Sequence, residues 1–530
     1  MITRSDLPND IETLKAMLVA QDELIVAKNG LIVAKDELID TKDKTILTKD
    51  DRIVRLEGLL AAFKQALFGR KSEKLDPDQF DLSLEDIETA IATVIAEDEA
   101  DPHIAAVTDL HKRKVNRGSL PKHLPRIEEV LEPETTVCAC GCALHVIGED
   151  VSERLDIIPA QFQVIVTRRP KYACRLCEEG IHQALAPSHL ILGGIPTEAT
   201  IAHVLVSKYA DHLPLYRQSE IYARQGIDLD RSTLADWVGR AAFELKPVFE
   251  CLRAQLKQSS KLFMDETRAP VLDPGRRKTK TGYFWALARE DAPWGGEDPP
   301  GVAFTYAPGR SGQYAETILK GFNGTLQVDG YAGYNRLLKR REGPIKLAYC
   351  WVHARRKLYE ISKNSTAPIA EEGLSRITAL YRIEADIRGQ SASARLAIRQ
   401  AQAAPLIAEF KQWLTQNRNR VSRKSPLGEA LTYIAKYWEG LILYLTDGQI
   451  EMDNNAVERA IRPITLNRKN ALFAGHDTGA QNWAMIASLI ETAKLNKIEP
   501  HAYLTKTLTA IANGHKQSDI EMLLPWNHHS

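Results

Sequence analysis

The sequence has no long apolar run and no excess of charge of either sign. None of its hydrophobic stretches approaches the roughly 20 residues that a membrane-spanning helix requires. The opening residues, MITRSDLPNDIETL, lack the apolar segment of a secretory signal, so we expect a cytoplasmic protein. Lysine plus arginine and aspartate plus glutamate both number 69, so the net charge does not indicate which partners bind.

Positive charge is missing from one long segment. Between Leu75 and His103 the chain has acidic residues but neither lysine nor arginine. Residues 111–126 then carry six lysines or arginines and no acid. Such segregation is typical both of interaction segments and of solvated linkers. Residues 76–127 are therefore predicted to form an acidic and then basic linker, with a role in binding left open.

Apolar residues at a spacing of seven mark the first segment of this 530-residue chain. They form one column, which consists of Ile11, Leu18, Ile25, Ile32, Ile39, Ile46, Ile53 and Leu60. A heptad column of this length predicts a long helix in a coiled coil, and hence self-association through residues 1–75. The seam is interrupted by Lys28, Lys35, Lys42 and Lys49. A single amphipathic helix packed on the body is the alternative.

Cysteine is scarce, with seven residues, yet five of them fall within one short region. These are Cys138, Cys140 and Cys142 in CACGC, and Cys174 and Cys177 in CRLC. Thiol pairs on two separated segments suit a tetrahedral structural zinc ion. Residues 128–190 are therefore predicted to form a zinc module, with two knuckles joined by a β-rich hairpin. Two of the first three cysteines would be ligands, and free reduced cysteines are the alternative.

Residues 191–258 show the apolar spacing of short helices. Asp230 or Ser232 can cap the last of them, which carries the apolar residues Leu234 and Trp237. This pattern predicts a helix-turn-helix-like region, whose last helix would enter the major groove of DNA. A purely structural helical bundle fits the same pattern.

Short apolar runs of strand length begin at Leu262. LFMD, YFWALA and VAFTYA predict an antiparallel meander, which a helix and the strands TLQVD and KLAYC follow. This order is that of a ribonuclease H-like α/β sheet, in which strands one and four are parallel neighbours. Asp265 and Asp329 would then emerge side by side at one end of the sheet. The predicted fold is multidomain α+β, with this core in residues 259–365 and 449–480.

Two adjacent carboxylates repel each other unless a cation lies between them, and their oxygens suit Mg²⁺ or Mn²⁺. A third acid would complete a two-metal site, and EMDNNAVERAIRP offers candidates. Glu458 follows an Asn-Asn pair in the first turn of a predicted helix, on one face with Arg459 and Arg462. Glu451 and Asp453 are chemical alternatives, and Glu458 could instead only pair with Arg462.

Four motifs in fixed order resemble the IS66 family of insertion-sequence transposases. They are MDETR, VDGYAGYN, CWVHARRK and DNNAVERAIRP. FGRKSEKL, the cysteine region and the ending NRKNALFAGHDTGAQNWAMIASLIETAKLNKIEPHAYL are similar to that family too. The resemblance covers nearly the whole chain, apart from the acidic segment and a middle insert. It implies a DNA transposase with an Asp-Asp-Glu catalytic triad.

The resemblance assigns Asp265, Asp329 and Glu458 as the three catalytic, metal-binding acids. With Mg²⁺ or Mn²⁺ they would cleave DNA at the element ends, and the freed 3′-hydroxyl would then attack target DNA. The expected partners are DNA, a second copy of the chain and possible small accessory proteins, which implies association with the nucleoid. The alternative is a sequence-specific DNA-binding protein, or a nuclease on the same fold without strand transfer.

Further residues near the site follow from the same motifs. His353 and Arg356 match a family signature, where they would contact phosphate or flanking DNA, with helix packing as the alternative. Arg459 and Arg462 are expected to contact DNA beside the third acid. One departure concerns zinc, because the family's first knuckle resembles Cys-Pro-x-Cys-Gly whereas this chain has CACGC.

Residues 366–448 are predicted to form a helical insert. Helical spacing is present in LSRITALYRIEADI, PLIAEFKQWL and ALTYIAKYWEGLILYL. By resemblance to other transposases with the Asp-Asp-Glu triad, such an insert would shape the DNA channel. Residues 481–530 are predicted to form a helical C-terminal segment.

Overall fold

The computed structural model consists of two units, Met1–Pro159 and Ala160–Ser530. The residues it describes are 10–68, 161–173, 181–191, 193–273, 278–339, 344–364 and 366–528. The predicted linker and the predicted zinc ligands Cys138, Cys140, Cys142, Cys174 and Cys177 lie outside these residues. Within the described ranges, no helix combines the length and the apolarity needed to cross a membrane.

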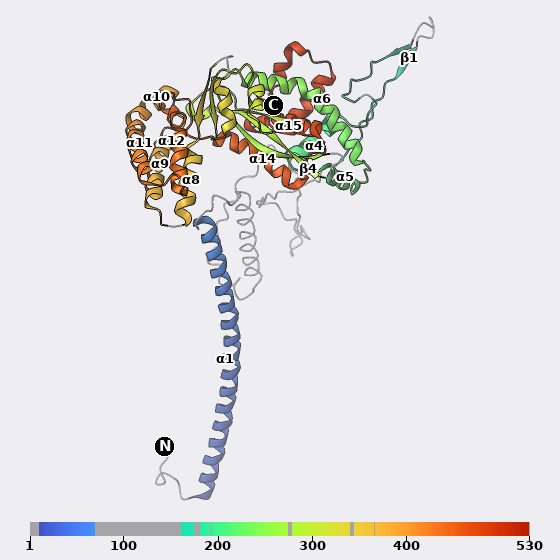
Figure 1. The fold of residues 1–530 in the computed structure, drawn as a ribbon. Helices are drawn as coiled ribbons and strands as arrows, with labels where there is room; N and C mark the ends of the chain where they lie inside the picture. Colours follow the sequence, from blue (N-terminus) through green and yellow to red (C-terminus); the bar gives the residue numbers. More distant parts are fainter. Residues whose placement is uncertain are drawn as a thin grey trace, which may run out of the picture. The chain divides into compact units, whose positions relative to one another are not determined.

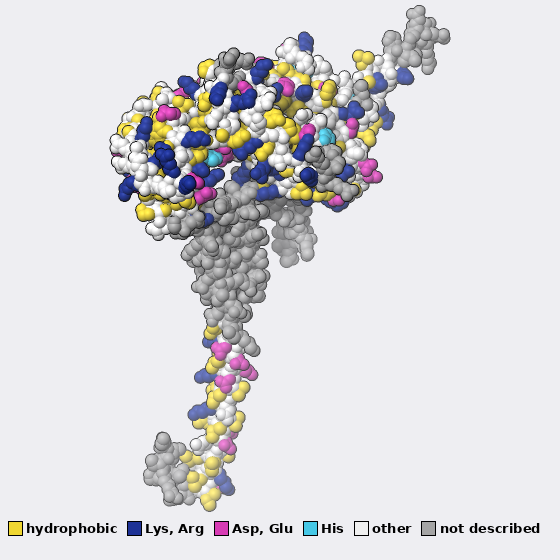
Figure 2. All heavy atoms as spheres, in the orientation of Figure 1, with side chains coloured by type: hydrophobic (Ala, Val, Ile, Leu, Met, Phe, Trp, Pro, Cys, Tyr) yellow, Lys and Arg dark blue, Asp and Glu magenta, His cyan; other side chains and the backbone are white. Residues whose placement is uncertain are grey.

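One long helix forms the described part of the first unit. α1 runs from Ile11 to Phe68 over 58 residues, as the heptad pattern predicts (Figure 1). Asp10 precedes it and accepts hydrogen bonds from the backbone N and the hydroxyl of Thr13, at 3.1 and 2.5 Å. The apolar column is exposed, with Ile25 48% and Ile32 55% accessible (Figure 2). The helix is confirmed, whereas its pairing in a coiled coil stays a prediction.

A short antiparallel hairpin lies near the start of the second unit. β1 (Lys171–Ala173) pairs with β2 (Ile181–Gln183), and the Gln183 amide donates to the Arg169 carbonyl at 2.8 Å. The prediction of a β-rich stretch from Phe162 onward, which was to join the two knuckles, is thus wrong over most of its length. Val164 is 88% exposed, and no strand among the described residues pairs with this stretch.

Three helices occupy residues 191–258, as predicted. They are α4 (Glu198–Tyr209), α5 (Leu215–Ala223) and α6 (Arg231–Leu256). Asp230 occupies the N-cap position of α6, although its side chain makes no capping hydrogen bond. α6 is longer than the predicted short helix, because its buried residues continue from Leu234 to Leu256 within the same apolar core as the sheet. Its entry into a DNA groove stays a prediction.

A five-stranded sheet forms the centre of the second unit (Figure 1). Its strands are β3 (Lys261–Asp273), β4 (Lys278–Arg289), β5 (Gly301–Ala307), β6 (Gly324–Val328) and β7 (Ile345–Tyr349). The order is β5-β4-β3-β6-β7. β3, β4 and β5 are antiparallel neighbours, while β3–β6 and β6–β7 are parallel. The predicted meander and the parallel pairing of strands one and four are therefore present.

β3 extends further than the sequence indicates. The apolar run predicts a strand that ends at Asp265, but β3 continues to Asp273. Its pairing with β6 ends at Phe263, whereas its antiparallel pairing with β4 continues up to Asp273. Asp265 therefore lies just past the end of the parallel contact and not at the end of the strand. The hairpin partner keeps the polar half of β3 extended.

Helices pack on this sheet and complete the core. They are α7 (Gly312–Ile318), α14 (Asn455–Ala471), α15 (Asp477–Leu495) and α16 (Pro500–Ala512), with the short turns η1 (Ala292–Trp294), η2 (Ala332–Lys339), η5 (Gln517–Leu523) and η6 (Pro525–Asn527). Two hydroxyls of α15 accept hydrogen bonds from the backbone of the edge strand β5. Ser488 accepts from the N–H of Phe304 at 2.7 Å, and Thr492 accepts from the N–H of Val302 at 3.1 Å. The outer edge of the sheet is thereby closed.

Thr492→Val tests this edge contact. Thr492 also donates to the Val302 carbonyl at 3.0 Å, so valine leaves a buried donor and a buried acceptor without partners. We expect the free energy of unfolding to fall by about 1–3 kcal/mol in urea titrations. Thr415→Val, at an exposed position of the helix Ala404–Arg420, is the matched control and should change the free energy of unfolding little. Equal stability of wild type and Thr492→Val would contradict the assignment.

The helical insert has a second apolar core of its own. Its elements are α8 (Trp351–Asn364), α9 (Pro368–Asp386), α10 (Ala392–Ile398), the π-helical η3 (Arg399–Ala403), α11 (Ala404–Arg420), α12 (Pro426–Lys436), α13 (Trp438–Leu441) and η4 (Leu443–Leu445). Trp351, Ala354 and Leu358 of α8 are buried in this cluster. The helix that follows β7 thus joins the sheet to the insert.

The predicted helical run ALTYIAKYWEGLILYL is broken into α12, α13 and η4. α12 ends at Lys436, and the ring of the next residue, Tyr437, packs on Tyr349 with centroids 4.5 Å apart. A Cβ at Gly440 would lie 2.2 Å from the Tyr349 ring, so the chain passes close to the sheet there. Contact with β7 outweighs the propensity to continue one helix.

Candidate active site

Asp265 lies in a buried and acidic environment on β3. Its Oδ1 accepts a hydrogen bond from the Glu266 N–H at 2.8 Å. Burial raises the pKa of Asp265 to about 8, and the charges of Asp329, Glu266 and Glu458 act in the same direction. The structure thus brings Asp329 and Glu458 close enough to Asp265 to disfavour its ionised form.

Asp329 directly follows β6, as predicted. Its Oδ1 accepts from the Tyr331 N–H at 2.9 Å. Gly330 lies between them, where a Cβ would be 2.3 Å from the Tyr433 hydroxyl of α12. Tyr437 donates to the Gly330 carbonyl at 2.6 Å. The insert therefore packs against the backbone that carries Asp329, and the glycine of VDGY permits that approach.

The segment before α14 is bound to the sheet by polar side chains. Gln327, two residues before Asp329, donates to the carbonyl of Glu451 at 2.9 Å and accepts from its N–H at 2.8 Å. Asn454 is fully buried at the start of α14, and its amide donates to the Met264 carbonyl at 3.3 Å. These bonds hold the first turn of α14 beside the strands that carry both aspartates.

Glu458 lies in that first turn, as the sequence predicts. Its Oε1 is buried and has no hydrogen-bond partner in the described part of the chain. The chemical alternatives have other partners: Glu451 pairs with Arg395 at 2.8 Å, and Asp453 accepts from the N–H of Asn455 at 3.1 Å. Of the three acids in this segment, Glu458 is the one that leaves a buried oxygen unpaired.

Glu266 was missed as a separate feature of the site. Its side chain is fully buried. It forms an ion pair with Arg310 at 2.6 Å and accepts a hydrogen bond from the Tyr334 hydroxyl at 2.7 Å. Arg310 also stacks on Tyr331 with 4.0 Å to the ring centroid. Burial raises the pKa of Glu266, and the bonds from Tyr334 and Arg310 oppose that. The adjacent acids of MDETR were the only sequence signal of this network.

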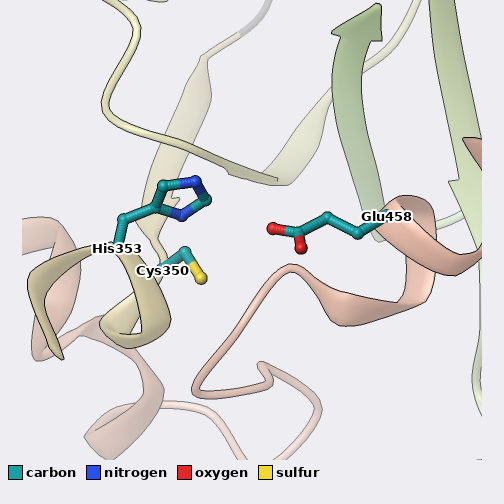
Figure 3. A group of neighbouring side chains, drawn as sticks. All are labelled: Cys350, His353 and Glu458. Atoms are coloured by element: carbon teal, nitrogen blue, oxygen red, sulfur yellow. The ribbon is translucent and has the colours of Figure 1, made fainter. Parts of the chain in front are cut away.

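Cys350 and His353 lie opposite Glu458 (Figure 3). Each of the three side chains offers one possible ligand atom, and these atoms all lie within 4.8 Å of one another. Across the described residues, no other three acids, histidines or cysteines meet this condition, including the predicted triad. Burial lowers the pKa of His353, while the charges of Glu458 and Asp329 oppose that. Sequence reasoning had given no role to Cys350.

The predicted DNA-contacting arginines are exposed. Arg356 lies on α8, three residues after His353, and its charge contributes to lowering the pKa of that histidine. Arg459 and Arg462 lie on α14. Figure 2 shows Lys and Arg side chains over much of the visible face of the second unit. The positions are compatible with phosphate contacts, which stay a prediction.

Four parts of the chain match known transposase domains. Residues 193–482 match the domain described as Transposase IS66 family. The chain belongs to this family. Residues 488–526 match the IS66 C-terminal element, and residues 55–128 match a domain described as Transposase C of IS166 homeodomain. The resemblance seen in the motifs is therefore confirmed, from the end of α1 to the C-terminal helices.

Relatives of this IS66 family chain match it over nearly its full length. Protein y4qI of Sinorhizobium fredii (strain NBRC 101917 / NGR234) is 40% identical over 99% of this chain and 98% of its own. Protein y4jD of the same strain is 43% identical, over 90% of this chain and 94% of its own. Both bear the description "uncharacterized", so they support membership of a shared lineage rather than a biochemical role.

The cysteine region matches the zinc-finger binding domain of transposase IS66, over residues 135–178. This range includes all five clustered cysteines. The predicted zinc-binding module is supported at the level of the domain. The choice of two ligands among Cys138, Cys140 and Cys142 stays a prediction, because these residues lie outside the described part of the chain.

Two of the three acids have features that a bound divalent cation would relieve. Asp265 is a partly buried acid whose pKa is raised to about 8 by burial and by other acids, and Glu458 Oε1 has no hydrogen-bond partner among the described residues. A hard cation with carboxylate ligands would remove both penalties. The family match also indicates that a divalent metal is used.

Asp265 predicts a pH dependence of stability in protein without added Mg²⁺. Its folded-state pKa, about 8, lies above the usual 3.8, so the folded chain holds more protons than the unfolded chain between these values. The free energy of unfolding should therefore fall as pH rises from about 4 to about 8. Asp265→Asn should remove this part of the slope in urea titrations. An unchanged slope in the variant would contradict the placement of Asp265.

Proposed function

We propose that this chain is a DNA transposase that cleaves and joins strands at insertion-sequence ends. In this proposal Asp265, Asp329 and Glu458 are the catalytic triad and hold Mg²⁺ or Mn²⁺. The observation that carries it is the convergence of β3, β6 and the first turn of α14, where burial and the charges of Asp329 and Glu458 raise the pKa of Asp265. The family match to the transposase domain supports the same reading.

The proposal includes a ribonuclease H-like core. Its support is the order β5-β4-β3-β6-β7, with three antiparallel strands followed by two parallel ones. In such a sheet the first and fourth strands carry the first two acids. The helical insert between β7 and α14 would form one wall of the DNA channel, since Tyr433 and Tyr437 pack beside Asp329.

The chain's own side chains have distinct tasks in this mechanism. A bound divalent cation would neutralise charge on the scissile phosphate and activate the attacking oxygen. Arg310, fixed by Glu266 and stacked on Tyr331, orders the loop that presents Asp329. The exposed Arg356, Arg459 and Arg462 would hold DNA through its phosphates.

Other parts of the chain would bring the DNA ends together. The exposed heptad column of α1 would pair two subunits, and the zinc module with α4 to α6 would bind the element ends. The accessory proteins suggested by the family resemblance would act with this assembly. Localisation at the nucleoid would follow from these DNA contacts.

The test uses full-length protein, Mg²⁺ and labelled duplexes from either side of the gene. The proposal predicts nicking at the ends, and then joining of the labelled 3′ end to a second duplex. Cleavage without joining would favour the nuclease alternative. Binding without cleavage, in the presence or absence of the accessory proteins, would favour the DNA-binding alternative and contradict the proposal.

A further inference from the structure

Cys350, His353 and Glu458 form a compact group with mixed donor atoms, here called the thiol–imidazole–carboxylate group. Cys350 follows β7, His353 lies in the first turn of α8, and Glu458 lies in the first turn of α14. Figure 3 shows the Glu458 carboxylate pointing toward the other two side chains. The ligand atoms lie within 4.8 Å of one another. Three separate elements therefore converge on one point.

Two atoms of this group lack partners. His353 Nδ1 and Glu458 Oε1 are buried, and neither makes a hydrogen bond to any described residue. An unsatisfied buried polar atom is destabilising, so two of them in one group require an explanation. A cation bound between them would supply it.

The donor set selects a particular class of cation. Mg²⁺ prefers oxygen ligands and octahedral geometry, whereas zinc binds sulfur, imidazole nitrogen and carboxylate oxygen together. A tetrahedral ion with bonds of about 2.0–2.3 Å places its ligands roughly 3.3–3.8 Å apart. Small side-chain movements would bring the group to that spacing. Its fourth position would stay open for water.

The sulfur already has the surroundings of a metal ligand. The Asn454 N–H donates to Cys350 Sγ at 3.3 Å, and the backbone N–H of His353 also bonds to it. Hydrogen bonds of this kind orient a ligand and stabilise a metal-bound thiolate. On binding, the thiol would release its proton to solvent, as coordinating thiols do.

We propose that the thiol–imidazole–carboxylate group is a second metal site, which takes a divalent cation of the zinc class and is distinct from the zinc module. Because Glu458 belongs to both sites, a zinc ion bound here withdraws the third acid and inhibits Mg²⁺-dependent cleavage. The binding part stands on the geometry alone. The inhibitory part rests on the proposed function.

Cobalt titration tests the binding part. Full-length protein, purified with zinc in its zinc module, is titrated with Co²⁺, and the thiolate-to-cobalt charge-transfer band is recorded. The site predicts a band in wild type, which is lost in Cys350→Ser and needs at least about tenfold more Co²⁺ in His353→Ala. Cys251→Ser is the matched control, since Cys251 and Cys350 are the two free cysteines among the described residues.

The band should remain in Cys251→Ser. An equal band in wild type and Cys350→Ser, or none in wild type, would overturn the site. Because Cys350 is buried, each variant is first checked by its melting temperature without Co²⁺. His353→Ala, at a less buried position, keeps the test decisive if Cys350→Ser does not fold.

Cleavage assays test the inhibitory part. Zn²⁺ added to Mg²⁺ reactions should lower wild-type cleavage, and Cys350→Ser should need at least about tenfold more Zn²⁺ for the same fractional loss. Equal sensitivity of both proteins would overturn the inhibition. If wild type cleaves no DNA in Mg²⁺ alone, the proposed function fails, while the cobalt band still decides whether the site exists.

Discussion

Asp329→Asn is expected to lower strand cleavage by about a hundred- to a thousandfold, while DNA binding persists. Asparagine keeps the size of the side chain and its bond from the Tyr331 N–H, but it removes the negative charge beside Asp265. Asp265→Asn and Glu458→Gln should have losses of the same order. Initial rates on labelled end duplexes, with binding measured on the same DNA, provide the readout.

The matched control is Glu360→Gln, an exposed acid on α8, which should cleave like wild type. Asp453→Asn examines the choice of the third acid, because Asp453 precedes α14 and accepts a hydrogen bond from the N–H of Asn455, the first residue of that helix. We expect this variant to lower the free energy of unfolding and to change the cleavage rate per folded molecule little. A rate loss in Asp453→Asn equal to that of Glu458→Gln would mean that the third acid is wrongly assigned.

Arg399→Met is expected to lower the free energy of unfolding by about 3–5 kcal/mol. Arg399 is fully buried and binds both oxygens of Glu384, at 2.7 and 2.8 Å. It also donates to the carbonyls of Tyr444 and Asp447, both at 3.0 Å. Methionine would leave two carbonyls without a donor inside the insert, and Glu384 with only the longer contact to Arg395, at 3.4 Å. Urea titration of the full chain measures the loss.

Arg376→Met is the control for that variant. Arg376 pairs with Glu372 at 2.9 Å near the surface, so its loss should cost at most about 1 kcal/mol. The double variant Arg399→Met/Glu384→Leu should recover part of the stability, since it also removes the Glu384 charge. A loss for Arg399→Met no larger than that for Arg376→Met would contradict the buried network.

The order of the strands could be predicted because apolar runs of strand length reveal it directly. LFMD, YFWALA and TLQVD correspond to β3, β4 and β6, and the parallel neighbours follow from their order. The extent of β3 could not be predicted in this way. Its second half mixes polar residues with the buried Ala269 and Val271, and it is held extended by pairing with β4, which a short apolar run does not reveal.

The two aspartates of the site could be predicted for the same reason, since each lies next to an apolar strand. Glu458 needed the family resemblance, because three acids within eight residues have similar local patterns. Only the fold separates them, through Arg395 beside Glu451 and the hydrogen bond from the Asn455 N–H to Asp453. Cys350 and Glu266 carry roles that depend on partners from distant segments. No local pattern indicates those partners.

The most direct measurement is Mn²⁺ binding to the full-length protein, followed by electron paramagnetic resonance. Wild type and Glu360→Gln should bind Mn²⁺ alike. Asp265→Asn, Asp329→Asn and Glu458→Gln should each weaken that binding at least about tenfold, because each removes one ligand of a shared site. Undiminished Mn²⁺ binding in all three variants would contradict the account, since the three acids would then not hold the metal.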